Sequence, residues 1–209
     1  MEKSDLTTEQ YERLSNAITA IVAEMGPSHT TMDLVAKRLG MSKRTLYEIF
    51  GSKDDMMRDI MQSIHQQMNR DIEEIVKSSE NVMESMARVI GYYKEHMKRL
   101  NANFFRDMDS RYKNLRSEYE TSERSDLLHL TQAIRIGIRQ DVFRRDVNYP
   151  VMLRLLRVQM ESLKRMEEFF PPDITLVEAY DTIGTSFMRS IATPKGMEIL
   201  EKVNEKLKN

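Results

Sequence analysis

Apolar residues recur at intervals of three and four along nearly the whole chain, the spacing that places them on one face of an α-helix. In residues 8–25, for example, Tyr11, Leu14 and Ile18 share such a face. No stretch of useful length alternates apolar and polar residues as a half-buried strand does. The pattern predicts an all-α fold with helices over residues 8–25, 31–39, 43–50, 53–77, 81–100, 104–120, 122–140, 150–169 and 173–192, and a short charged helix from residue 194.

Glycine residues and polar caps mark where the first helices begin and end. Gly40 and Gly51 can adopt the left-handed backbone conformation that ends a helix at little cost. Thr7, Ser42 and Ser52 precede predicted helices, where a hydroxyl can accept a hydrogen bond from a free backbone N–H group. We expect an N-terminal domain of residues 1–56 and a helical C-terminal domain of residues 57–209, joined by the long fourth helix.

The segment from Thr30 to Lys53 contains two short predicted helices separated by a tight turn at Gly40. This is the arrangement of a helix-turn-helix. Ala36 is small where the two helices must approach, and Leu46 belongs to the apolar side of the second helix. The polar side chains left outside, which we predict to contact DNA, are Thr31, Ser42, Lys43, Arg44, Thr45, Tyr47 and Lys53.

These side chains suit different parts of a DNA duplex. A helix of this width fits the major groove, with its N-terminal residues nearest the base edges. Lys43 and Arg44 can donate to guanine O6 and N7 or to phosphates, and Thr45 can touch a base edge or a thymine methyl group. Tyr47 and Lys53 are better placed for phosphates, which fix the register but carry no sequence information.

Charge is concentrated in the same segment. The whole chain has 32 Lys and Arg against 33 Asp and Glu, a net charge of -1. Between Lys37 and Lys53, however, the only anion is Glu48, against five cations, so the segment carries a net charge of +4. Thr31, at the start of the preceding helix, can bind a phosphate through its hydroxyl and the free N–H groups there.

Several runs in this part of the chain form a recognisable set: Thr30-Thr31-Met32, Val35-Ala36, Leu39-Gly40-Met41-Ser42-Lys43, Thr45-Leu46-Tyr47, Phe50 and Ser52-Lys53-Asp54-Asp55. With them, residues 8–56 closely resemble the DNA-binding domain of TetR-family transcriptional regulators. The resemblance implies an N-terminal three-helix DNA-binding domain and a helical body for effector binding and dimerisation. It also implies binding to a palindromic operator, usually as a repressor.

Two positions depart from the family pattern. Ile49 stands where the family often has His or Tyr, so one common backbone contact is expected to be missing. Arg44 stands where a small residue is frequent, which adds a candidate base or phosphate contact. Glu48 would repel phosphate unless it pairs with a cation or accepts from a cytosine amino group. A charged run is usually only a solvated surface, but its combination here with the turn, the caps and the family spacing favours DNA binding.

An effector pocket is predicted in the C-terminal domain, where residues 134–166 also resemble the family. Met and aromatic side chains can line an adaptable pocket, although such stripes more often form plain core. No set of cationic anchors is evident, which favours a largely apolar or aromatic ligand. The residues predicted to line the pocket are Met97, Phe104, Phe105, Met108, Tyr112, Ile134 and Met160.

The last two long helices are predicted to form the interface of a homodimer, because a palindromic operator matches a two-fold symmetric protein. Gly184 lies in a helix interior, where glycine costs on the order of 1 kcal/mol relative to Ala, and close approach of a partner helix would offset this cost. The alternative is that Gly184 packs against a helix of its own chain. The predicted dimer face consists of Val177, Tyr180, Gly184, Phe187, Met188 and Ile191.

The sequence offers no catalytic or metal-binding constellation. It has no cysteine, and its four histidines are far apart, so none forms the i, i+4 pair of helical metal sites. A glycine-rich phosphate loop and a nucleophile elbow are also missing. Adjacent acids such as Glu73 and Glu74 project from a helix in different directions. We therefore expect no enzymatic activity, no cofactor and no metal.

The composition favours a cytoplasmic protein. No apolar run reaches the roughly 18 residues of a membrane span, and no apolar core follows a basic start as in a signal peptide. We predict a repressor that a small, largely apolar ligand releases from a palindromic DNA operator. The alternatives are a DNA-binding dimer controlled by a protein partner or by its own level, and a helical interaction module that has lost DNA binding.

Overall fold

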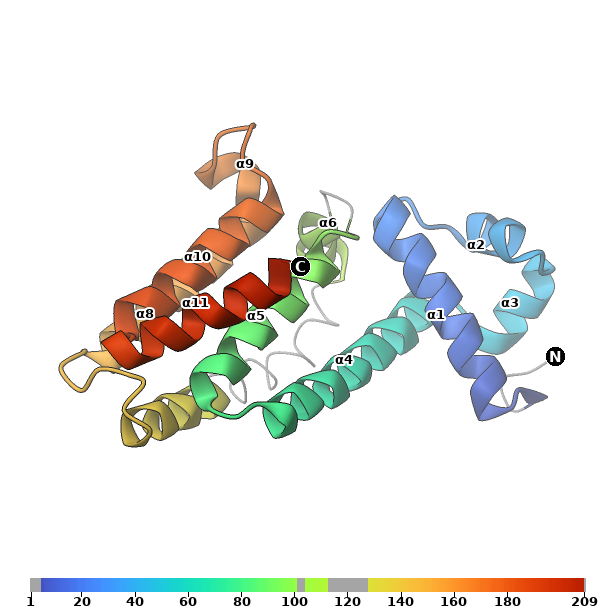
Figure 1. Ribbon diagram of the computed structural model, residues 1–209. Helices are drawn as coiled ribbons and strands as arrows, with labels where there is room; N and C mark the ends of the chain where they lie inside the picture. Colours follow the sequence, from blue (N-terminus) through green and yellow to red (C-terminus); the bar gives the residue numbers. More distant parts are fainter. Residues whose placement is uncertain (1–4, 101–103, 113–127, 209) are drawn as a thin grey trace. The chain divides into compact units, whose positions relative to one another are not determined.

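The computed structural model describes residues 5–100, 104–112 and 128–208, and these ranges confirm the predicted all-α fold (Figure 1). Within them, the β-structure consists of one isolated bridge between Phe143 and Ala192. Residues 128–139 are helical. The other elements are α1 (Thr8–Met25), α2 (Met32–Leu39), α3 (Lys43–Phe50), α4 (Lys53–Ser78), α5 (Val82–Met97), α6 (Phe104–Arg111), α8 (Tyr149–Ser162), the 3-10 turn η2 (Leu163–Arg165), α9 (Met166–Phe169), α10 (Leu176–Ile191) and α11 (Pro194–Lys208).

Several boundaries differ from the predicted ones, and three of these differences change the description of the fold. The helix expected over residues 104–120 ends at Arg111, and the rest of that range from residue 113 lies outside the described residues. The helix expected over residues 150–169 is divided, because the turn η2 separates α8 from the short α9. Finally, α10 begins after Thr175 rather than after Asp173, since Thr175 and Glu178 form a reciprocal capping box.

The N-terminal helices α1, α2 and α3 pack around fully buried side chains, among them Ile18, Val35 and Leu46. The expected capping box at the start of α1 is present. The Thr7 hydroxyl accepts from the backbone N–H of Gln10 at 3.3 Å, and the Gln10 side chain accepts from the backbone N–H of Thr7 at 2.9 Å. Local signals in the sequence thus placed the first helix at its observed residues.

The helix α4 passes through both compact units of the chain. One unit comprises the described parts of Met1–Arg70 and Arg99–Leu115, and the other comprises the described parts of Asp71–Lys98 and Arg116–Asn209. The division lies inside α4, and α6 groups with the N-terminal helices. The predicted boundary after residue 56 instead placed most of α4 and all of α6 in the second domain.

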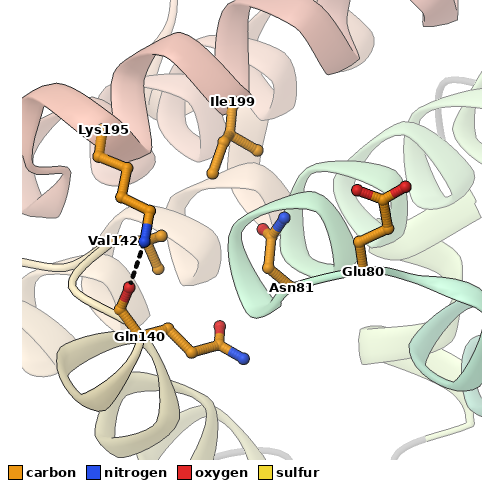
Figure 2. A pocket seen from close by; sticks show the side chains of 6 residues that line it. All are labelled: Glu80, Asn81, Gln140, Val142, Lys195 and Ile199. Atoms are coloured by element: carbon orange, nitrogen blue, oxygen red, sulfur yellow. Dashed lines mark hydrogen bonds between the residues drawn. The ribbon is translucent and has the colours of Figure 1, made fainter.

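A polar junction in the second unit joins the start of α5, the end of the 128–139 helix and the start of α11 (Figure 2). Nζ of Lys195 donates to the carbonyl oxygen of Gln140 at 2.9 Å, and the side-chain oxygen of Gln140 accepts from the backbone N–H of Val82 at 3.0 Å. Asn81 caps α5 by accepting from the backbone N–H of Glu84 at 3.0 Å. A depression of about 380 Å³ lies here, and its polar groups are employed in holding helix ends together.

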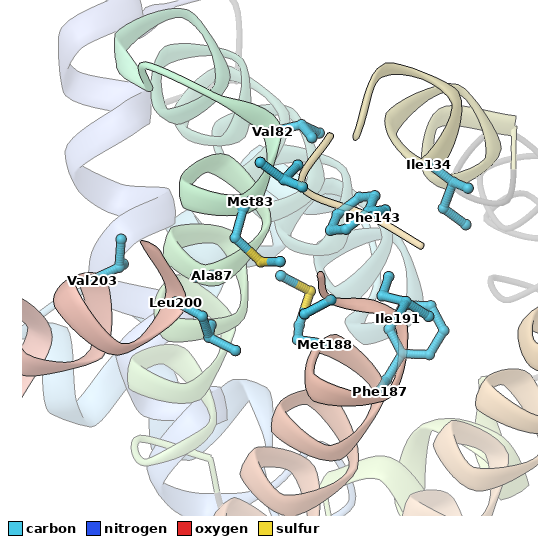
Figure 3. Packing of buried hydrophobic residues seen from close by; sticks show 12 residues of the cluster. Val82, Met83, Ala87, Ile134, Phe143, Phe187, Met188, Ile191, Leu200 and Val203 are labelled. Carbon is cyan, nitrogen blue, oxygen red and sulfur yellow. The ribbon is translucent and has the colours of Figure 1, made fainter. Parts of the chain in front are cut away.

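The main apolar core of the second unit lies where α5 packs against α10 and α11 (Figure 3). At its centre lie side chains with almost no solvent exposure, among them Met83, Phe143 and Met188. The buried members of this core are Val82, Met83, Ala87, Ile134, Val142, Phe143, Phe187, Met188, Ile191, Ala192, Leu200 and Val203.

Phe143 reaches this core by lying directly against Gly137 of the preceding helix. A Cβ atom at position 137 would lie 2.0 Å from Cδ2 of Phe143. The backbone N–H groups of Val142 and Phe143 both donate to the carbonyl oxygen of Gly137, at 2.9 and 3.1 Å. The chain therefore turns back closely over this glycine, and a side chain there would collide with the aromatic ring.

We expect Gly137→Ala to destabilise the protein by about 1–3 kcal/mol, the usual cost of overpacking a core. In an open helix position the same change would stabilise by roughly 1 kcal/mol, so the sign of the effect tests the packing. Thermal unfolding followed by circular dichroism measures it. Gly184→Ala is the matched control: its Cβ would meet Cγ2 of Ile90 at 3.1 Å, so a smaller loss is expected. An unchanged or raised stability of Gly137→Ala would contradict the contact with Phe143.

Candidate nucleic-acid interface

The turn between α2 and α3 confirms the predicted helix-turn-helix. Gly40 adopts the left-handed conformation, with φ 64° and ψ 24°, which glycine takes without steric cost. The backbone N–H of Met41 donates to the carbonyl oxygen of Ala36 at 2.9 Å and so closes the turn. Ala36 is buried, as expected for the place where the two helices approach. Each helix has eight residues.

The helix α3 buries one side and exposes the other. Leu46, Ile49 and Phe50 are buried in the N-terminal core. The exposed side carries Lys43, Arg44, Tyr47 and Glu48, and the remaining polar residue, Thr45, is half-buried. Ile49, which departs from the family pattern, is therefore part of this core.

Three of the hydroxyl groups predicted to contact DNA also cap or brace the two helices. Thr31 accepts from the backbone N–H of Leu34 at 3.1 Å and caps α2. Ser42 accepts from the backbone N–H of Thr45 at 3.0 Å and caps α3. The two hydroxyl oxygens of Ser42 and Thr45 lie 2.7 Å apart. These groups therefore fix the start of each helix, whatever further contacts they make.

Two predicted base-reading cations form ion pairs. Nζ of Lys43 lies 2.6 Å from the Asp33 carboxylate, and Nε of Arg44 donates to Oε1 of Glu48 at 2.8 Å. Hydrogen bonds to these carboxylates raise the pKa of Lys43 and of Arg44 above their ordinary values. The Arg44 hydrogen bond also lowers the pKa of Glu48. Glu48 thus pairs with a cation, one of the two arrangements expected for it.

A third cation of the basic segment is paired as well. Arg38 donates two hydrogen bonds to the carboxylate of Glu24, at 3.0 and 3.1 Å. Solvent-exposed ion pairs of this kind contribute only about 0–1 kcal/mol to stability. Phosphate oxygens can therefore take the place of these carboxylates at little cost.

Lys53 has a structural role that sequence reasoning missed. Its Nζ donates to the carbonyl oxygens of Pro27 at 2.9 Å and Ser28 at 3.4 Å, which belong to the loop between α1 and α2. Burial lowers the pKa of Lys53, and the nearby Arg111 cation acts in the same direction. Residues 27 and 53 are far apart in sequence, and no local pattern indicates that they meet.

A depression of about 210 Å³ lies beside α3 and brings four of the seven predicted DNA-contacting residues together. It is lined by Thr31, Met32, Asp33, Lys43, Tyr47 and Lys53. The other three, Ser42, Arg44 and Thr45, lie on the first turn of α3 or its cap. The structure thus groups the predicted contacts into a notch at the start of α2 and the leading end of α3.

The α6 helix contacts the same loop that Lys53 holds. The backbone N–H of Ser28 donates to Oδ2 of Asp107 at 3.0 Å, and Asp107 is buried. Tyr112, just beyond α6, is buried too, and this burial raises its pKa. No sequence signal singled out Asp107, because a lone acid on a predicted helix is ordinarily solvated.

The residues predicted to line an effector pocket are divided among separate places. Ile134 belongs to the main core of the second unit. Met97 and Met160 pack against a second cluster, formed by Leu163, Ala179, Tyr180 and Ile183. Phe104, Met108 and Tyr112 lie at α6 in the first unit, and the side chain of Phe105 lies outside the described part of the structure.

The predicted dimer face is largely covered by its own chain. Five of its six residues are buried on α10, namely Tyr180, Gly184, Phe187, Met188 and Ile191, and Val177 is half-buried. A Cβ at Gly184 would lie 3.1 Å from Cγ2 of Ile90, which is on α5 of the same chain. The structure therefore has the intrachain packing that was the alternative for Gly184.

In the described ranges, no helix is sufficiently long and apolar to cross a membrane. Nor do any three or more His, Cys, Asp or Glu side chains in those ranges gather as ligands for a metal ion.

Comparison with known proteins agrees with this geometry. Residues 15–60, which include α2 and α3, match the family described as bacterial regulatory proteins of the tetR family. An uncharacterised helix-turn-helix transcriptional regulator of Bacillus subtilis, YhgD, is 24% identical over 138 residues, covering 64% of this chain and 72% of YhgD.

Solved structures share the fold over most of the chain. The TetR-family regulator PfmR of Thermus thermophilus has a TM-score of 0.58 at 21% identity, covering 85% of this chain and 97% of PfmR. A transcriptional regulator of Saccharomonospora viridis in complex with choline has a TM-score of 0.68 at 16% identity, covering 90% of this chain and all (100%) of that one. With its helix-turn-helix and the match over residues 15–60, the chain carries a DNA-binding domain of the TetR family of transcriptional regulators.

Proposed function

We propose that the chain binds a palindromic DNA operator as a homodimer, with α3 of each protomer in the major groove. The observation that carries this proposal is the orientation of α3: its apolar side is buried, and Lys43, Arg44 and Tyr47 point outward. Lys43 and Arg44 occupy the first turn, the end of a recognition helix that approaches the base edges. Tyr47, one turn later, is placed for the DNA backbone.

The notch beside α3 is suited to a phosphate group of the DNA backbone. Thr31, Lys43, Tyr47 and Lys53 supply hydroxyl and ammonium donors around it, and Asp33 is the acidic residue of its lining. Asp33 is paired with Lys43 at 2.6 Å, so an incoming phosphate would compete with this carboxylate for the ammonium group. Such contacts fix the register of the protein on the duplex.

An exposed apolar stripe on α8 supports the homodimer. Val151, Leu155 and Val158 follow one another at intervals of four and three residues, and they expose 49%, 53% and 67% of their surface. No residue of α8 is fully buried within the chain. A continuous apolar stripe favours a protein partner, and a second copy is the partner that a palindromic site requires. The α8 stripe replaces the predicted α10 face in this proposal.

The first candidate for the regulation is a repressor that a small, largely apolar ligand releases from the operator. The regulator of Saccharomonospora viridis in complex with choline supports a small-molecule effector for this fold. A ligand acts by binding one arrangement of the protein better than another. Two elements are suited to transmit that preference: α4, which passes through both units, and α6, whose Asp107 accepts from Ser28.

The second candidate is a DNA-binding dimer without a small-molecule effector, controlled by a protein partner or by its own level. The packing of Ile134, Met97 and Met160 in two different clusters favours it, since these side chains are used as core. Under either candidate we place the protein in the cytoplasm with its DNA. Release of DNA by a ligand distinguishes the first candidate from the second.

Footprinting on the DNA that flanks the chain's own gene should reveal a protected site with two-fold symmetry. Binding should weaken steeply between 50 and 200 mM salt, by roughly 10³-fold if six phosphates are contacted. Tyr47→Ala should weaken binding to all duplexes several-fold, because it removes a backbone contact without sequence information. Phe169→Ala, another exposed aromatic residue, is the control and should bind normally. Asymmetric protection, or binding insensitive to salt, would contradict the proposal.

The α8 stripe yields a prediction about assembly. Val158→Glu should convert the dimer into a monomer, because the interface would bury an unpaired carboxylate. Light scattering during size-exclusion chromatography gives the mass directly. Val76→Glu is a matched control, since Val76 is likewise an exposed valine, at 53%, but lies on α4. A dimer that survives Val158→Glu would place the interface elsewhere.

The contact between α6 and the α1–α2 loop can be tested by hydrogen exchange. Asp107→Ala removes the acceptor of the Ser28 N–H group, and losing a partner in a part-buried place costs roughly 1–3 kcal/mol. Exchange at the Ser28 amide should therefore accelerate by roughly 5- to 150-fold. Asp107→Asn retains an oxygen acceptor and should show a smaller change. Identical exchange in all three proteins would show that α6 does not hold this loop.

A further inference from the structure

Arg44 and Glu48 pair through one edge of the guanidinium group. The hydrogen bond described for Arg44 uses its Nε, which donates to Oε1 of Glu48 at 2.8 Å. A guanidinium group has five N–H donors in one plane. Pairing through Nε fixes that plane and leaves the far edge of the group, with one N–H from each terminal nitrogen, directed away from the carboxylate. Two parallel donors are the arrangement that binds O6 and N7 of guanine.

The order of the pair along α3 is not the order that stabilises a helix. An acid four residues before a base is favourable, and the reverse order is weaker. The exposed pairs Glu9–Arg13 on α1 and Glu73–Lys77 on α4 follow the favourable order. In α3 the cation comes first, in the opening turn where the helix dipole disfavours positive charge. Helix stability therefore does not account for the pair.

The two side chains differ strongly in exposure. The Glu48 side chain exposes 32% of its surface, whereas the Arg44 side chain exposes 88%. Glu48 is thus the more covered member of the pair, and the Arg44 side chain is largely open to solvent on the side of α3 proposed to enter the groove. In this arrangement Glu48 can hold the exposed Arg44 side chain in one orientation.

We propose that Glu48 is a positioning residue that holds Arg44 for bidentate recognition of one guanine in each half-site. The inference rests on the proposed function, and it deepens it by naming the base and the residue pair. Glu48 also lowers the affinity for DNA in general, because its negative charge repels phosphates. Its removal should therefore affect sequence preference and non-specific binding in opposite directions.

The test uses the full-length protein and a library of randomised DNA duplexes, from which bound sequences are selected and read. The wild-type protein should select a symmetric pair of guanines. Arg44→Ala should lose that preference by roughly 5- to 150-fold, the discrimination of one bidentate contact. Glu48→Ala should reduce the same preference several-fold while its affinity for a random duplex rises. Combining the two substitutions should add nothing to the loss in Arg44→Ala, and Glu48→Gln, which retains an oxygen acceptor, should restore part of the preference.

Glu9→Ala removes the same charge from an exposed Arg–Glu pair on α1 and should leave the selected sequences unchanged. If wild-type protein selects guanine and Glu48→Ala selects it equally well, the positioning role is overturned and the proposed function stands. If Glu48→Ala changes base preference even in the Arg44→Ala background, Glu48 reads a base directly and the proposal is also overturned. If wild-type protein selects no sequence from the library, the proposed function itself fails.

Discussion

A helix of eight residues is not stable by itself in water, because its first turn fixes several residues before hydrogen bonds compensate for the lost entropy. The helix α3 therefore depends on the burial of Leu46, Ile49 and Phe50 and on the cap supplied by Ser42. This burial also determines which side chains face outward. The placement of Lys43 and Arg44 is thus a consequence of packing in the apolar core, and their charges act only once that packing has oriented them.

The N-terminal helices could be predicted closely because their signals are local. The Thr7–Gln10 capping box, the left-handed turn at Gly40 and the cap at Ser42 all involve residues within a few positions of one another. Contacts over long distances in sequence gave no such signal. The bond from Lys53 to the Pro27 carbonyl and the bond from Ser28 to Asp107 depend on tertiary packing, and both were found only in the structure.

The C-terminal body shows a different limit of sequence reasoning. An apolar stripe on a helix has the same spacing whether it faces its own chain or a second copy. The α10 stripe was assigned to a dimer interface, yet Gly184 of that stripe packs on Ile90. The α8 stripe, with Leu155 and Val158 exposed, could be recognised only from the packing of the described helices. The sequence spacing of Met97 and Ile134 is likewise the same whether these side chains line a pocket or pack in a core.

The ion pairs of the N-terminal unit have a consequence for how the protein searches a genome. In the free protein, Glu24, Asp33 and Glu48 occupy cations that would otherwise attract RNA and other anionic polymers. A phosphate that takes the place of Glu24 or Asp33 exchanges one ion pair for another, so a poorly matched segment gains little from the exchange. The protein is therefore expected to dissociate quickly from poorly matched DNA and to remain bound where base contacts are added.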